Sequence, residues 1–265
     1  MAAPRDPDHS FESLVEIIKI LRKECPWDRK QTHESLKDLM IEEIYEAIDA
    51  IDQQDYQELK KELGDLLLHV IFHSVMGDEN KEFDINDVIW GIQEKLIRRH
   101  PHVFDTTEVS GTEEVLKNWE AIKMKEHKRK SVLEGVPRQL PALLRAQRMQ
   151  EKAAGVGFDW PTWQEAWEKL DEEIGEFKDE AEIKNPTAED LRKRNEEFGD
   201  LMFALVNVGR KIGISVEDQL RKTNDKFQNR FQHIEQHFSK KNQALNDVTL
   251  DQMEEIWQDA KKLER

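Results

Sequence analysis

Two segments of the sequence place a pair of acids one helical turn apart, directly before an apolar run. KELGDLLLHVIFH (61–73) carries Glu62 and Asp65, and EEFGDLMFALVNV (196–208) carries Glu197 and Asp200. Residues three or four apart share one face of an α-helix, so the two acids of each pair project together. Paired carboxylates are the ligands that hard divalent cations use in proteins. A metal site is therefore the first hypothesis for both segments.

A second acid pair precedes each of these segments. IEEIYEAIDA (41–50) contains Glu43 and Glu46, and DEEIGEFKDE (171–180) contains Glu173 and Glu176. If the two helices of a copy are antiparallel neighbours, four carboxylates converge. Two such charges about 4 Å apart repel by roughly 4 kcal/mol at an effective dielectric near 20, so the group needs cations or raised pKa values. An all-oxygen set favours Mg²⁺, with Mn²⁺ as a substitute.

The alternative is that these acids are solvated surface or partners in ion pairs. The chain has 56 Asp and Glu residues, so E-x-x-E spacings also arise by chance. A metal site is favoured because the pairs are linked, because the pattern occurs twice, and because Gly64 and Gly199 stand beside the acids. Glycine inside a helix costs about 1 kcal/mol relative to alanine, which predicts close helix approach or space for a ligand.

The same motifs occur in the same order in both halves of the chain, which indicates an internal repeat. Each half also has a Lys and an Arg four apart, in EKLIRRHPHVF (94–104) and DKFQNRFQHI (225–234), and ends near a Trp and a Lys four apart, in WEAIK (119–123) and WQDAK (257–261). A segment with a charge run, two prolines and one glycine separates the halves at 125–144. We predict two copies of one helical domain, over 1–125 and 142–265, joined by a linker over 126–141.

Helix start and stop signals run through both copies. Cap residues followed three positions later by an acid or an amide predict helices over 163–184, 188–211, 216–239 and 250–263. Earlier helices are predicted over 10–24, 32–53, 55–76, 84–99 and 112–127. Strand alternation is absent from the sequence. The predicted fold class is all-α.

The composition favours a globular protein and argues against proteins that bind nucleic acid or span a membrane. Of 265 residues, 37% are hydrophobic, which is enough to bury a core, and the net charge of −16 argues against binding nucleic acid, which needs clustered cations. Cys25 is the only cysteine, and neither an apolar leader nor a membrane-length apolar run is present. We expect a cytoplasmic protein that binds neither nucleic acid nor membrane.

Comparison of the two copies indicates whether two histidines of the first copy are metal ligands. His69 lies one turn after Asp65, but its counterpart in the second copy is Ala204, and His73 corresponds to Val208. A ligand needed in both copies would not be replaced by alanine. We therefore predict that both histidines are core or dimer-interface residues rather than ligands of a di-iron site.

Basic residues of the second copy fit an anionic substrate, because Mg²⁺ shares oxygens with bound phosphates. Lys193 lies four residues before Glu197 on the same helical face, whereas its counterpart in the first copy is Glu58. Ordinary ion pairing with the excess acid stays open for each cation, and core packing stays open for the tryptophan. The remaining candidates are Lys226, Arg230, Trp257 and Lys261.

Taken together, CPWDRKQT (25–32), the EExxE and ExxD pairs, RRHPHVF (98–104) and GFDW (157–160) resemble the MazG family of nucleoside triphosphate pyrophosphohydrolases. The resemblance spans nearly the whole chain. It implies an all-α homodimer that cleaves NTPs and dNTPs between the α and β phosphates, giving NMP and pyrophosphate. It also implies Mg²⁺ dependence and a C-terminal domain with most or all of the activity.

The resemblance also implies roles for individual residues. Glu58, in place of a phosphate-binding lysine, makes the first copy the weaker candidate. We expect in-line attack by a metal-activated water that Glu172 or Glu173 orients or deprotonates. The implied metal ligands are Glu173, Glu176, Glu197 and Asp200, with Glu43, Glu46, Glu62 and Asp65 in the first copy. The implied substrate contacts are Lys193, Lys226, Arg230, Trp257 and Lys261.

Two other functions fit the same pattern. One is a phosphohydrolase of narrower range, acting on dUTP, dCTP or a guanosine tetraphosphate alarmone, and the other is a non-enzymatic helical adaptor. A P-loop NTPase is excluded because the chain has no GxxxxGK[ST] segment. The main hypothesis places the enzyme in nucleotide-pool housekeeping or stress response. Base preference would depend on the loops around CPWD and GFDW.

Overall fold

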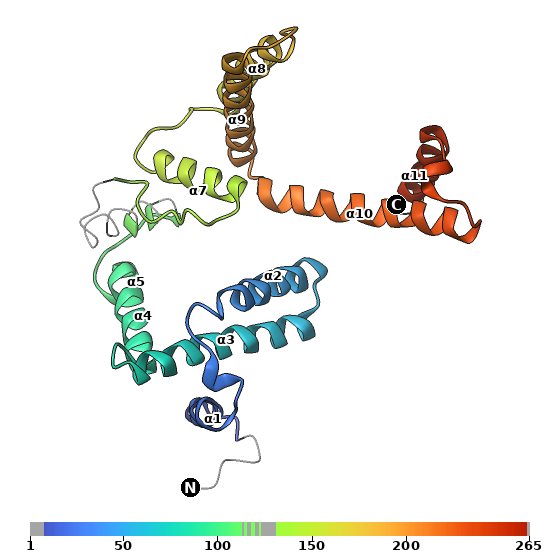
Figure 1. The fold of residues 1–265 in the computed structure, drawn as a ribbon. Helices are drawn as coiled ribbons and strands as arrows, with labels where there is room; N and C mark the ends of the chain where they lie inside the picture. The colour runs from blue at the N-terminus through green and yellow to red at the C-terminus, as the bar shows by residue number, and fades with distance from the viewer. Residues whose placement is uncertain (1–7, 113, 116–117, 120–121, 123–130, 264–265) are drawn as a thin grey trace. The chain divides into compact units, whose positions relative to one another are not determined.

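The computed structural model of the chain describes residues 8–112, 114–115, 118–119, 122 and 131–263 (Figure 1). Contacts divide the chain into two compact units, Met1–Val115 and Leu116–Arg265. The regular elements among the described residues are all helical, which confirms the predicted all-α class. The predicted domain boundary near 125 and most of the predicted helix over 112–127 lie outside the described residues. None of the described helices combines the length and the apolar character that crossing a bilayer requires.

The first unit is organised around the longest of its helices, α3 (Tyr56–Glu79), which pairs with α2 (Lys37–Gln53) and also packs against α1 (Phe11–Glu24). Val15 and Ile18 lie three apart on α1 and share a buried cluster with Ile71 and Phe72 of α3. This packing holds the acid-bearing stretch of α3 in place. The remaining elements are η1 (Asp28–Lys30), α4 (Ile85–Arg99) and α5 (Pro101–Phe104).

The second unit is organised around a hairpin of α8 (Trp163–Ala181) and α9 (Ala188–Lys211), the most extensively paired helices of the chain (Figure 1). Ala166 and Leu170 of α8 pack on Ala204 and Val208 of α9. Helix α7 (Ala142–Ala154) packs on α9. After α9 the chain continues into α10 (Val216–Lys240), η2 (Leu245–Asp247) and α11 (Leu250–Leu263), and α11 packs against α10.

Side-chain caps fix where the hairpin helices start. The hydroxyls of Thr162 and Thr187 accept hydrogen bonds from the backbone amides of Glu165 and Asp190, as the sequence signals predict. α9 spans the predicted residues, whereas α8 ends at Ala181, three residues early. Asn185 follows with a positive φ of 59°, a conformation that asparagine tolerates better than most residues, and so makes the turn into α9.

Helix α7 was missed in the sequence analysis, which predicted no helix between the linker and residue 163. Pro141 contributed to this error, because it was taken as part of the joint between the two halves. Proline stops a helix only from within, and at a helix start its missing N–H and fixed φ suit the first turn. Here Pro141 caps α7 with a φ of −47°.

Of the two alternatives predicted at Gly64 and Gly199, close helix approach is wrong within each unit, whereas space for a ligand stays a prediction. A Cβ added at either position would have nothing within 4 Å among the described atoms. The glycines that packing requires lie near the ends of the same helices. A Cβ at Gly77 would lie 2.7 Å from the carbonyl oxygen of Phe83, and one at Gly209 would overlap the side chain of Val216.

The histidines of α3 lie in the packing of the first unit, in agreement with their predicted role as core residues. His69 is buried, and the ring of His73 stacks on His33 with 5.0 Å between centroids and 2.7 Å between the two Nδ1 atoms. Burial, followed by the charges of His33 and His69, lowers the pKa of His73. The neutral form of His73 is therefore favoured.

We predict opposite effects for two alanine substitutions in α3. Gly77→Ala forces the new methyl group against the Phe83 carbonyl and should lower stability by about 1–3 kcal/mol. Gly64→Ala places its methyl group in open space and should leave stability unchanged or raise it by up to about 1 kcal/mol. Thermal unfolding of the two variants tests this, and equal losses in both would contradict it.

Candidate active site

In the second unit the α8–α9 hairpin gathers three of the four predicted metal ligands. Glu173 and Glu176 come from α8 and Glu197 from α9, and one carboxylate oxygen from each lies within 4.8 Å of the others. Glu173 is only 7% exposed. Asp200 lies one turn after Glu197 on α9, where its charge acts on Glu197.

The first unit repeats this arrangement on α2 and α3. Glu43, Glu62 and Asp65 offer oxygens within 4.8 Å of one another. The fourth predicted acid, Glu46, is hydrogen-bonded to Glu62. Each copy therefore brings three carboxylates together through the pairing of two helices, as expected from the spacing.

Crowding of negative charge changes the acidity of these groups. Burial, followed by the charges of Glu46, Glu58 and Glu43, raises the pKa of Glu62 to about 7. Burial and the surrounding carboxylates also raise the pKa of Glu197. Each ionised acid disfavours ionisation of the next. A bound cation would offset this repulsion and lower the pKa of both groups. Oxygen-only donors suit Mg²⁺ or Mn²⁺.

Lys169 is a residue of this site that the sequence analysis missed. Its ammonium lies 2.8 Å from a carboxylate oxygen of Glu173 and 2.8 Å from one of Glu172. Hydrogen bonds to Glu172 and then to Glu173 raise the pKa of Lys169. The i+3 and i+4 spacing was a usable signal. The counterpart of Lys169 in the first copy is Leu39, so this cation belongs to the second site alone.

A cavity of about 680 Å³ adjoins the second acid group. Its walls are mostly apolar and come from Val132 and Leu133, from α7, from the GFDW segment and from α9. Glu173, Asp200 and Lys169 line the same cavity. Its volume lies in the range of pockets for small organic ligands. Apolar wall residues include Met149, Ala153, Phe158, Trp160 and Phe203.

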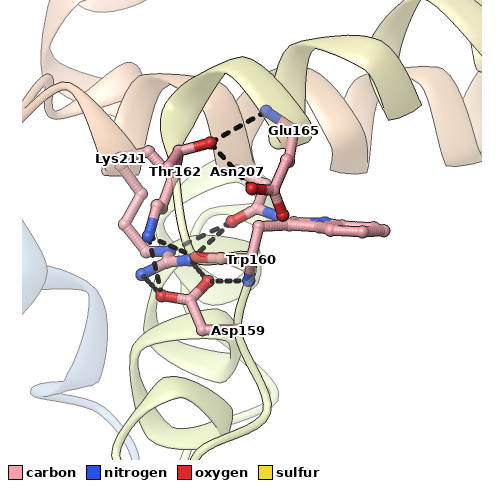
Figure 2. A network of polar contacts seen from close by, with 7 residues as sticks. Asp159, Trp160, Thr162, Glu165, Asn207 and Lys211 are labelled. Atoms are coloured by element: carbon pink, nitrogen blue, oxygen red, sulfur yellow. Dashed lines mark hydrogen bonds and ion pairs between the residues drawn. The ribbon is translucent and has the colours of Figure 1, made fainter.

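The GFDW segment is fastened to the end of α9 by ion pairs (Figure 2). Asp159 accepts hydrogen bonds from Arg210 and Lys211, and Lys211 also donates to the Trp160 carbonyl over 2.7 Å. Burial raises the pKa of Asp159, but the hydrogen bonds from these cations outweigh it, so the pKa is lowered overall. Arg210 donates to Asn207 as well, over 2.6 Å. The cavity wall is thus tied to the helix that carries Glu197.

The first unit has a different surface beside its acids. A cavity of about 220 Å³ is lined there almost wholly by polar side chains, among them Glu46, Asp49, Asp55 and Glu58. Glu58 pairs with Lys61. This small acidic cavity lacks the apolar walls of its counterpart in the second unit.

The predicted phosphate and nucleotide contacts fall in two places. Lys193 is exposed on α9, one turn before Glu197. The others lie on α10 and α11, where the guanidinium of Arg230 stands 5.4 Å from the ring centre of Trp257. Lys226 and Lys261 are exposed on the same two helices. The structure therefore joins Arg230 to Trp257, but it does not place them in the acid group of α8 and α9.

Comparison with known proteins identifies the family. The model of the MazG nucleotide pyrophosphohydrolase domain matches residues 31–104. The chain is 42% identical to the nucleoside triphosphate pyrophosphohydrolase of Escherichia coli K12, over 97% of this chain and 98% of that protein. It is 44% identical to the nucleoside triphosphate pyrophosphohydrolase/pyrophosphatase MazG of Thermotoga maritima, over 95% of each chain. A Mycobacterium tuberculosis nucleoside triphosphate pyrophosphohydrolase is 38% identical over 55% of this chain and 46% of its own length. The chain belongs to the MazG family of nucleotide pyrophosphohydrolases.

Proposed function

We propose that this enzyme hydrolyses NTPs and dNTPs at the α–β anhydride bond, with the second unit as the catalytic one. Water is consumed, and NMP and pyrophosphate are released. The observation that carries the proposal is the continuity between the acid group of α8 and α9 and a cavity large enough for a nucleoside. The names of the full-length relatives support the same reaction class.

Mg²⁺, with Mn²⁺ as substitute, is part of the proposal. The fit rests on the donor chemistry, because Glu173, Glu176 and Glu197 carry more negative charge than Lys169 alone offsets, and the pKa of Glu197 is raised. The ligands would be Glu173, Glu176, Glu197 and Asp200. A bound divalent ion would supply charge neutralisation for the phosphates and a more acidic water.

Side chains of the second unit would position the attacking water and bind the nucleotide. Glu173 is buried and held by Lys169, which fixes its carboxylate in one orientation for positioning the attacking water. Glu172 shares that lysine but its side chain is 58% exposed, which makes it the weaker candidate base. Lys193 would bind phosphate oxygens from the face of α9 that carries Glu197. Arg230 and Trp257 would contact the nucleotide, together with Lys226 and Lys261.

A homodimer completes the proposal. The α8–α9 hairpin of one chain leaves Ile174, Phe198 and Leu205 between 40% and 51% exposed. Large apolar side chains exposed together favour burial in an assembly, and a two-fold dimer is the commonest way to bury them. The molar mass in solution, measured by light scattering, distinguishes a dimer from a monomer.

Product analysis tests the reaction class against its alternatives. We expect NMP and pyrophosphate from NTPs and dNTPs incubated with Mg²⁺, read by ion-exchange chromatography across all eight common nucleotides. Turnover of dUTP or dCTP alone would support the narrower phosphohydrolase. NDP and phosphate as products would contradict cleavage at the α–β bond, and no turnover with either metal would support the adaptor.

Substitution of matched acids tests which copy is catalytic. Glu197→Ala removes a carboxylate from the proposed ligand group and should lower kcat/KM by about 100-fold or more while far-UV circular dichroism stays unchanged. Glu62→Ala removes the corresponding acid of the first copy and should cost only a few-fold. Comparable losses in both variants would reverse the ranking of the two units.

The pKa of Glu62 predicts a pH-dependent response to metal. Because its folded-state pKa is raised from 4.5 to about 7, metal-free protein should lose stability as pH rises across this interval. Mg²⁺ binds ionised carboxylates, so it should raise the melting temperature more at pH 8 than at pH 5.5. Glu62→Gln should flatten the metal-free profile, whereas Glu16→Gln, at an exposed position on α1, should not. A metal response that is the same at both pH values would contradict the prediction.

A further inference from the structure

Arg194 of α9 forms a polar contact between the two helices that carry the second acid group. Its Nε and its Nη2 both donate to the backbone carbonyl of Glu180 on α8, over 3.0 and 2.8 Å. Because α8 ends at Ala181, this carbonyl belongs to the last turn, whose carbonyls have no partner within the helix. A guanidinium suits that position, since it presents two donors in one plane and its charge is favourable at a helix C-terminus. The contact therefore fastens the end of α8 to α9.

This contact lies one helical turn beyond the acid group, on the side of the turn that joins the two helices. Arg194 precedes Glu197 by three residues on α9, and Glu180 follows Glu176 by four residues on α8. Each partner is therefore a neighbour of an acid on its own helix. Burial comes first among the causes that raise the pKa of Glu197, and the charge of Glu180 is among those that follow. The end of α8 that Arg194 holds is thus close enough to act on the acids.

Repulsion within the acid group acts against the pairing of α8 with α9. Glu173, Glu176 and Glu197 offer oxygens within 4.8 Å of one another, and each further ionised carboxylate favours a wider gap between the helices. Toward the core, the packing of Leu170 and Ala204 in one buried cluster resists this widening. Toward the turn, the hydrogen bonds of Arg194 resist it. A site that is held at a fixed width binds a cation more tightly, because less rearrangement accompanies binding.

The first copy cannot form this contact in the same way. In the register that aligns Glu197 with Glu62, Arg194 corresponds to Leu59, and a leucine side chain has neither a charge nor a donor. The guanidinium therefore belongs to the second copy, as do the ammonium groups of Lys169 and Lys193.

We propose that Arg194 is a positioning residue of the catalytic unit. By holding the last turn of α8 to α9, it sets the spacing between Glu176 and Glu197 at which a divalent cation binds. This rests on the proposed function and deepens it, since it assigns part of the metal affinity to a residue that is itself no metal ligand. Loss of the contact should weaken metal binding, whereas enzyme saturated with metal should react at nearly the same rate.

The test measures activity as a function of Mg²⁺ concentration. Every variant is made in the Glu62→Ala background, which removes the corresponding acid of the first copy and so limits metal binding there. Arg194→Met should raise the Mg²⁺ concentration for half-maximal activity by roughly 10-fold and leave kcat at saturating Mg²⁺ nearly unchanged. A fall in kcat at saturating Mg²⁺ without this shift would show a merely structural role and overturn the proposal.

Arg194→Lys is the milder variant, and it keeps the test decisive if Arg194→Met does not fold. Lysine keeps the charge, but it cannot place two planar donors on one oxygen as a guanidinium does. The shift in the Mg²⁺ response should be smaller than in Arg194→Met. A response equal to that of the Glu62→Ala parent would overturn the role of the paired hydrogen bonds.

Arg192→Met is the matched control. Arg192 lies two residues earlier on the same helix, and its guanidinium donates to Glu189 and Glu196 of α9 itself. Its substitution removes an equal charge and leaves the contact of Arg194 with α8 in place. The Mg²⁺ response should stay unchanged, and an equal shift in both variants would overturn the role of the contact.

Metal binding without turnover separates this inference from the proposed reaction. Titration with Mn²⁺ in the absence of nucleotide, followed by the electron paramagnetic resonance signal of the free ion, should show roughly 10-fold weaker binding in Arg194→Met than in the parent. If no nucleotide is hydrolysed but this loss is seen, the reaction is wrong and the role of Arg194 stands. Hydrolysis by the parent, together with unchanged Mn²⁺ affinity in Arg194→Met, would overturn the role of Arg194 alone.

Discussion

The site depends on one constraint: apolar packing between two antiparallel helices forces like charges together. Ala166 and Leu170 pack on Ala204 and Val208, and the acids of α8 and α9 lie on the same pair of helices. The hairpin cannot form without bringing these carboxylates close. Burial, followed by this repulsion, raises the pKa of Glu197, and the same two causes raise the pKa of Glu62 in the other copy. A fold that gains stability from its core thus creates, in each copy, a site that favours a cation.

The two copies share this constraint but differ in what surrounds it. Lys169 and Lys193 of the second copy correspond to Leu39 and Glu58 of the first, so the second acid group has two nearby cations where the first has an apolar and an acidic residue. The cavities differ in the same sense, about 680 Å³ with apolar walls against about 220 Å³ with acidic ones. The match to the family model falls on residues 31–104, in the first copy. Under the proposed function, the family-model match and the catalytic unit therefore fall in different copies.

Local signals in the sequence were sufficient for most of the helices and for the acid pairs. Caps at Thr162 and Thr187 and the i+3 spacing of Glu197 and Asp200 act within one turn, so they can be read without knowing the fold. Contacts between segments far apart in the sequence could not be predicted from local signals. Gln150 meets Phe203 across 53 residues, and α7 was not predicted although it supplies one cavity wall. The glycines show the same limit, because only the path of the chain after α3 reveals why Gly77, rather than Gly64, is needed.

Helix α9 connects the two chemical halves of the proposed site. Asp200 and Asn207 both line the cavity and lie seven residues apart on one helix, which corresponds to about 10 Å along its axis. That span is comparable with the reach of a nucleotide from its 5′ phosphate to the far edge of its base. The GFDW segment cannot shift independently of this helix, since Asp159 is held by Arg210 and Lys211 at its end. A rigid helix that carries the proposed metal ligands near its middle and an apolar cavity wall near its end would require a ligand to satisfy both at once. A free phosphate or a free base meets only half of that requirement, which is how such a site would select intact nucleotides.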